Sequence, residues 1–123
     1  MTFISNLKVT LDINNIKIDC NIKRHLSPSI VRQIANALPM ESTIHYMNRD
    51  FIYFQTKLIS GIERPKKQFK RGDIAYLPEN QSICIFLQDA TTKVMTPIGN
   101  VLDDLDGIVI EGSKNIVKFY ATG

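Results

Sequence analysis

Residues 72–87, which read GDIAYLPENQSICIFL, constrain the fold more than any other part of the chain. They contain two short apolar runs joined by a polar turn that includes Pro78. Neither run alternates cleanly between apolar and charged residues, a pattern typical of strands that are covered on both faces. We therefore expect these residues to form a strand pair at the centre of the core.

Length and composition bound the class of protein. A chain of 123 residues is long enough for one domain, 1–123, whose core needs no metal or disulfide to hold it together. Hydrophobic residues make up 44% and charged residues 22%, as in soluble globular proteins, and no apolar run could span a bilayer. We expect no membrane association. Because residues 1–7 lack an export signal, we expect a cytoplasmic protein.

Cysteine positions argue against a disulfide-stabilised protein, and net charge gives no support for a nucleic-acid-binding protein. Cys20 and Cys84 both fall inside apolar strand patterns, where a cysteine is usually a small buried hydrophobic residue, so we predict free thiols. The net charge of +3 is modest and does not by itself favour nucleic acid as a partner.

Two β-hairpins and one helix are predicted before residue 60. Apolar residues alternate along residues 7–13 and 16–22, and the intervening Asn14 and Asn15 tolerate the positive φ of a tight turn. Ser27 as N-cap, Pro28 at the first helical position and apolar residues at helical spacing predict a helix from Ser27 to Leu38. Its predicted apolar side contains Ile30, Val31, Ile34, Ala35 and Leu38. Residues 43–47 and 51–57 predict the second hairpin.

The rest of the chain alternates between predicted loops and strands. We expect loops over residues 63–71, which are rich in lysine and arginine, and over the polar residues 88–96. A short strand is expected over 97–102, where Gly99 predicts a bulge or a close backbone contact. A turn or short helix over 103–110 and a final strand over 115–121 complete the pattern. About eight short strands and one helix favour a mainly β, closed antiparallel barrel with the helix covering one end, and a two-sheet sandwich is the alternative.

Four motifs in order resemble those of a known family. FIYF at residues 51–54, GDIAYLP at 72–78, CIF at 84–86 and IGNV at 98–101 resemble the serial motifs of small bacterial and archaeal cyclophilin-like proteins. The resemblance implies a closed eight-stranded barrel capped by a helix, as in the cyclophilins, which are peptidyl-prolyl isomerases. The function of the small family itself is largely unassigned. The sequence of this protein departs from the family pattern at Asn48 and Arg49 and over residues 87–91, all of which lie in predicted loops.

The catalytic polar residues of cyclophilins have no counterparts at the matching positions. The resemblance places the essential arginine at Tyr46 and the two glutamines at Phe54 and Ile83. It places a groove aromatic residue at Ile85 and leaves Met95 near the histidine position. Because prolyl isomerisation by cyclophilins depends on a guanidinium beside the bound proline, the match predicts little or no catalysis.

Without these polar residues, the predicted groove is lined by a strip of apolar side chains. If Ile74, Tyr76, Cys84 and Phe86 point into the barrel, strand alternation places the intervening residues on the outside, facing a groove. The groove candidates are Tyr46, Phe54, Leu77, Pro78, Ile83, Ile85 and Met95, with Arg49 and His45 as polar contacts. A small apolar ligand or a peptide could bind there. Loops or a second subunit of a homo-oligomer could equally cover the strip.

Other chemistry finds little support in the sequence. His25 and His45 have no second ligand at metal spacing, no glycine-rich phosphate loop occurs, and the acidic residues 103–106 lack the pattern of a calcium loop. We expect no metal and no cofactor. The basic residues 63–71 favour a solvated loop over a nucleic-acid contact. The leading hypothesis is a non-catalytic binding module, the second a weak prolyl isomerase and the third a nucleic-acid binder.

Overall fold

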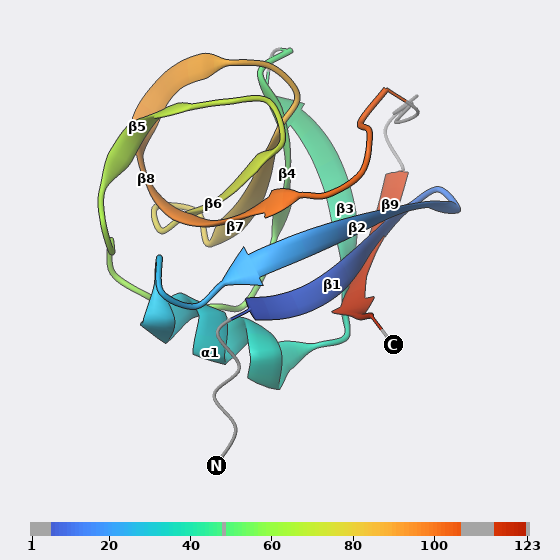
Figure 1. Ribbon diagram of the computed structural model, residues 1–123, viewed down its shortest axis with the longest axis horizontal. Coiled ribbons are helices and arrows are strands. Elements are labelled where there is room, and N and C mark those ends of the chain that lie inside the picture. Colours follow the sequence, from blue (N-terminus) through green and yellow to red (C-terminus); the bar gives the residue numbers. More distant parts are fainter. Residues whose placement is uncertain (1–5, 48, 107–114, 123) are drawn as a thin grey trace.

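The computed structural model describes residues 6–47, 49–106 and 115–122. Within these residues the chain forms nine strands and one helix (Figure 1). In order they are β1 (Asn6–Ile13), β2 (Ile16–Lys23), α1 (Pro28–Ala37), β3 (Met40–Met47), β4 (Phe51–Gln55), β5 (Lys66–Phe69), β6 (Asp73–Leu77), β7 (Ser82–Phe86), β8 (Ala90–Val101) and β9 (Asn115–Ala121).

The strands form a single antiparallel sheet that closes into a ring. Their order is β2-β1-β9-β3-β4-β7-β6-β8-β5, and an additional β2–β8 pairing closes the ring, while β5 pairs with β8 alone. The closing pairs include Cys20 with Val101 and Ile22 with Gly99. The predicted mainly β fold with a closed antiparallel sheet and one helix is confirmed, and the two-sheet alternative is wrong.

The first hairpin forms at its predicted turn. Asn14 and Asn15 both have positive φ, at 51° and 72°, as the two central residues of a tight hairpin turn require. The backbone N–H of Asn15 donates to Asp12 Oδ1 at 3.0 Å, and Asn14 Nδ2 donates to Asn115 Oδ1 at 2.8 Å. The turn is therefore held both locally and by β9.

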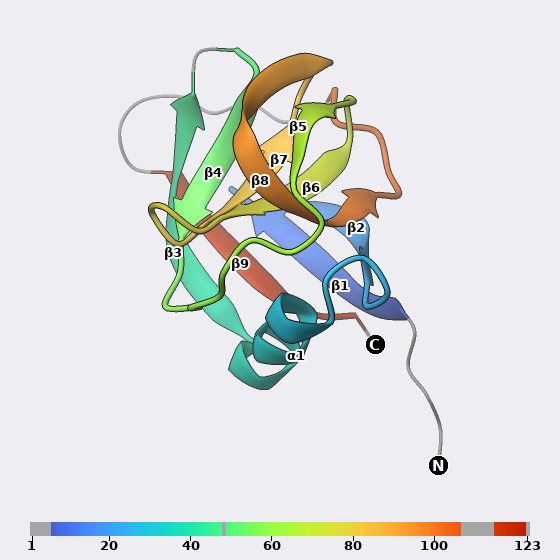
Figure 2. The same cartoon turned by 90° about the vertical axis from the view of Figure 1, so that its left-hand side faces the viewer.

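Helix α1 lies at one end of the ring, beneath β1 and β9 in Figure 2. Ile30, Val31 and Ile34 are buried in the main core, and Leu38 packs against it. Ala35 is exposed, so its predicted place on the apolar side is wrong. Ser27 occupies the N-cap position, but its hydroxyl donates to the Pro97 carbonyl oxygen and so ties the helix start to β8.

Two predicted loops contain strands. Residues 66–69 form β5, and β8 begins at Ala90 rather than near Pro97. Of the four residues of β5, only Phe69 is buried, and charge-rich edge strands of this kind carry no strong sequence signal. The start of β8 pairs only with β5, which explains its polar composition. Half of the segment over 103–110, where a turn or short helix is predicted, lies outside the described residues.

The buried residues divide into two clusters, one on each face of the sheet. The main core fills the ring and receives α1, while the second cluster lies on the outer face of β4, β7 and β6. Strand β5 and residues 90–95 of β8 form a two-stranded ribbon, here called the outer ribbon, which covers the second cluster through Phe69 and Met95. In Figure 2 this ribbon crosses in front of β7 and β6.

The predicted orientation of β7 is wrong. Ile83 and Ile85 belong to the main core inside the ring, whereas Cys84 and Phe86 belong to the second cluster outside it. All five residues of β7 are buried, so the strand shows no alternation from which its inner face could be predicted. The pairing of β7 with β4 determines which side chains face outward, because Phe86 lies opposite Phe51 and both belong to the second cluster.

Gly99 allows the ring to close. A Cβ atom at this position would lie 2.1 Å from the Asn21 carbonyl oxygen of β2. The β6–β8 register also shifts between Ile74 and Ala75, which pair with Gly99 and Pro97. The predicted close contact and bulge are both confirmed. Among the described residues, no helix is long and apolar enough to cross a membrane.

Candidate functional site

A groove of about 390 Å³ lies on the outer face of the sheet. The tip of the β3–β4 hairpin, the β6–β7 turn and the start of β8 enclose it. Its apolar lining residues are Met47, Phe51, Leu77 and Met95, and its polar lining residues are Asp50, Glu79, Asn80, Thr91, Thr92 and Lys93. The groove thus combines an apolar floor with a polar rim, as ligand sites commonly do.

The floor of the groove is part of the second cluster. Phe51, Leu77 and Met95 are only 4%, 8% and 1% exposed, so packing fixes their positions. Met47, by contrast, is 40% exposed and offers most of the accessible apolar surface. A ligand would therefore meet a rigid floor and one adaptable methionine side chain.

A row of aromatic rings connects the outer ribbon to β3. Ring centroids lie 4.6 Å apart for Phe69 and Phe86, 5.0 Å for Phe86 and Phe51, and 6.2 Å for Phe51 and Tyr53. The row ends at the exposed His45, whose ring centroid is 5.4 Å from that of Tyr53. Such neighbouring rings stabilise a packed face beyond the area they bury, so the row stiffens the wall beside the groove.

The rim of the groove carries more negative than positive charge. Glu79 forms an ion pair with Lys93 at 3.3 Å, and both side chains are well exposed, so the pair adds little stability. Asp50 accepts a hydrogen bond from Gln88 Nε2 at 2.7 Å. None of the described lining residues is an arginine.

The structure brings together only part of the predicted groove residues. Leu77 and Met95 line the groove, whereas Pro78 follows Leu77 outside the lining. Tyr46 is exposed but lies outside the lining as well. Phe54, Ile83 and Ile85 are buried in the main core, so their predicted place at a groove is wrong. Phe54 pairs with Ile83, and the neighbouring Ile52 pairs with Ile85. Paired residues share a face of the sheet, and here that face is the inner one.

Neither predicted polar contact lines the groove. Arg49 is exposed in the turn between β3 and β4, next to Asp50. His45 is exposed on β3 and contacts Tyr53. Met47 and Phe51 were missed as groove residues, although their pairing across the hairpin follows from the predicted turn.

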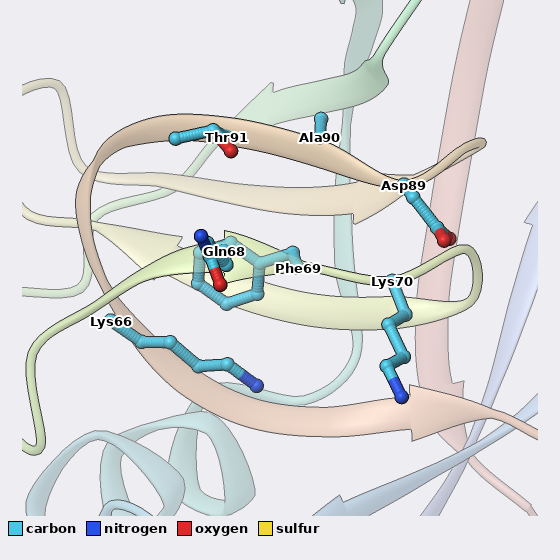
Figure 3. Close-up of a pocket in the computed structure, with 7 residues that line it drawn as sticks. All are labelled: Lys66, Gln68, Phe69, Lys70, Asp89, Ala90 and Thr91. Atoms are coloured by element: carbon cyan, nitrogen blue, oxygen red, sulfur yellow. The ribbon is translucent and has the colours of Figure 1, made fainter.

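A second hollow, of about 470 Å³, lies on the outer ribbon (Figure 3). Lys66 and Lys70 extend on either side of Phe69. Thr91 comes from the start of β8, which pairs with β5, and Asp89 directly precedes that strand. Lys66 Nζ is 5.4 Å from the centre of the Phe69 ring, a distance that allows a cation–π interaction.

The described residues contain no group of three histidine, cysteine, aspartate or glutamate side chains that could hold a metal ion. Both cysteines are buried free thiols, as predicted, and burial raises the pKa of each to about 12. The acidic residues near position 104 have partners within the protein. Asp103 accepts the backbone N–H of Asp19 at 2.8 Å, and Asp106 pairs with Arg71.

Comparison with known proteins identifies the family of this chain. A family model described as cyclophilin-like matches residues 7–120. The chain belongs to the cyclophilin-like family. The fold of this cyclophilin-like protein is similar to the solution structure of a hypothetical protein from Archaeoglobus fulgidus, with a TM-score of 0.75, 22% identity and coverage of 96% of each chain. No curated protein shows a significant match.

Proposed function

We propose that this cyclophilin-like protein is a non-catalytic binding module. Its groove on the outer face takes an apolar side chain of a peptide or a small apolar ligand. The observation that carries the proposal is the fixed apolar floor of Phe51, Leu77 and Met95 beside the exposed Met47. A preformed concave site with a few polar groups at its rim is the usual form of a ligand site.

The groove lacks the group that prolyl isomerisation in cyclophilins depends on. A guanidinium must act on the amide nitrogen as it loses conjugation, in a site where little water screens its charge. Because the part of the lining that the structure describes has no arginine, bound proline would meet apolar contacts without this stabilisation. A site that binds the ground state and the transition state of the peptide equally well does not accelerate the reaction.

A weak prolyl isomerase is the second candidate, and one observation favours it. Arg49 lies in the hairpin turn between Met47 and Asp50, both of which line the groove. A rotation of this exposed side chain could bring its guanidinium over the groove when a peptide binds.

Binding can be tested by titrating the full ¹⁵N-labelled chain with a set of short peptides that carry a leucine, a phenylalanine or a proline between polar residues. We expect saturable shifts of the amide resonances of Met47, Phe51, Leu77 and Met95. Met47→Glu should weaken binding by about tenfold, because a charge replaces the exposed apolar surface.

Ile59→Glu provides the matched control. Ile59 is 73% exposed and lies outside the groove, so the same change in charge and polarity should leave binding within about twofold. Equal losses in the two variants, or shifts confined to residues outside the groove, would contradict the proposal.

A further inference from the structure

A separate cleft of about 380 Å³ lies where β2 ends and where β6 and β8 meet. Residues 64–66 form its outer wall, and Lys23 and Leu26 follow the end of β2. Among the described residues, it shares no lining residue with the groove proposed above. The cleft is therefore a separate site from that groove.

Three basic side chains line this cleft: Lys23, Arg64 and Lys66. Within the described part of the chain, no carboxylate lies within ion-pair distance of any of them. Lys70 adds a fourth cation from the adjoining hollow on the outer ribbon, which shares Lys66 and Phe69 with the cleft (Figure 3). Cations without a carboxylate partner around a concave surface attract an anion more strongly than the same charges spread over a convex one.

The cleft also contains hydrogen-bond acceptors. Asp73 is the one carboxylate among the lining residues that the structure describes, and its Oδ2 accepts the backbone N–H of Lys70 at 2.9 Å. Asn100 lies opposite Asp73 in the β6–β8 register. Its carbonyl oxygen Oδ1 is enclosed and has no hydrogen-bond partner among the described residues, while its Nδ2 donates to the Val101 carbonyl oxygen at 3.3 Å. An enclosed acceptor without a partner is a group that a donor from a ligand can satisfy.

The cleft also has apolar lining residues. They are Leu26, Pro65, Phe69, Ile74 and Pro97. A ligand that fits all three parts has an anionic end, an apolar body and donor groups. The volume lies in the range of small-molecule sites.

We propose that this cleft binds a phosphorylated small molecule that carries hydroxyl or amino donors, such as a nucleoside monophosphate. Lys23, Arg64 and Lys66 hold the phosphate through charge-assisted hydrogen bonds. Asp73 and Asn100 accept hydrogen bonds from the hydroxyl or amino groups. A single-stranded nucleic acid fits less well, because Phe69, the one aromatic ring among the described lining residues, is buried and offers no face on which bases could stack.

The test titrates adenosine monophosphate into the full ¹⁵N-labelled chain at low salt. We expect saturable shifts at Lys23, Ile74, Gly99 and Asn100, with weaker binding of inorganic phosphate and of adenosine alone. Absence of saturable shifts with up to about 10 mM of the nucleotide, a concentration far above useful small-molecule affinities, would overturn the proposal.

Three charge-matched variants make the test specific. Lys23→Gln and Arg64→Gln should each weaken nucleotide binding by about tenfold, because each removes one charge-assisted contact. Lys67→Gln removes the same charge from an exposed position outside the cleft and should change affinity by less than about twofold. Equal losses in all three variants would overturn the proposal, since they would mean that overall charge alone attracts the anion.

A labelled single-stranded oligonucleotide completes the experiment. We expect it to bind more weakly than the mononucleotide at equal phosphate concentration. Tighter oligonucleotide binding with a steep salt dependence and an equal contribution from Lys67 would overturn the proposal in favour of a nucleic-acid surface.

Discussion

The ring of Phe69 stacks on the ring of Phe86, with centroids 4.6 Å apart and planes 12° from parallel. Phe69 is the only buried residue of β5, and Phe86 lies on the outer face of β7. This single contact therefore fixes much of the outer ribbon to the sheet. The ribbon in turn positions Met95, which forms one side of the groove floor.

Phe69→Ala should lower the free energy of unfolding by about 3–5 kcal/mol, because it leaves a cavity against Phe86 and removes the stacking contact. Urea denaturation followed by circular dichroism measures the change. The exposed neighbour provides a control, since Lys67→Ala should change stability by less than about 0.5 kcal/mol. A loss below about 1 kcal/mol for Phe69→Ala would mean that the ribbon does not depend on this contact.

Gly99→Ala should destabilise the protein by about 3 kcal/mol or more, because a Cβ only 2.1 Å from the Asn21 carbonyl oxygen forces β2 and β8 apart. The expected result is a lower urea midpoint and faster amide hydrogen exchange at the β2–β8 pairing. Gly61→Ala is the matched control, because a Cβ at Gly61 has no atom within 4 Å. Equal stability of the two variants would contradict this account of ring closure.

Burial of the Cys84 thiol predicts a loss of stability in alkaline solution. Burial raises the pKa of this thiol from 9.0 to about 12, so the folded state keeps the proton that the unfolded chain releases. The contribution is fully present below pH 9 and is lost as the pH rises from 9 toward 12.

Comparison of the unmodified protein with Cys84→Ala at pH 8 and at pH 10.5 isolates this contribution. The stability difference between the two proteins should shrink by about 1–2 kcal/mol over that interval, since each pH unit above the lower pKa counts about 1.4 kcal/mol. A constant difference would show that the thiol ionises as easily in the folded protein as in the unfolded chain.

Prolyl isomerisation should not be accelerated beyond background in a coupled peptide assay. Losing one preorganised donor typically costs a factor of about 100–1,000 in rate, and no arginine is found among the groove residues that the structure describes. Activity that disappears in Arg49→Ala would show instead that the arginine of the hairpin turn moves over the groove. Activity that survives Arg49→Ala and disappears in Tyr46→Phe would indicate a different catalytic group.

Local signals in the sequence were sufficient for much of the fold. The pair Asn14 and Asn15 predicted the first turn, because few residues other than glycine adopt positive φ so readily. The spacing of Ile30 and Ile34 predicted the buried side of α1. Gly99 marked the point where two backbones approach closely. The causes at the turn and in the helix act within a few residues, so the sequence alone determined those two outcomes. At Gly99 the sequence indicated a close contact, but its partner, Asn21 of β2, comes from a distant part of the chain.

The position of the groove depended on contacts between distant parts of the chain. Every residue of β7 is apolar or small and buried, so only its pairing with β4 decides that Phe86 faces outward and Ile85 inward. Strand β5 resembles a solvated loop until β8 pairs with it. Leu77 and Met95 meet in one site because the outer ribbon folds over the sheet, a consequence of burying one phenylalanine, Phe69, that no local pattern reveals.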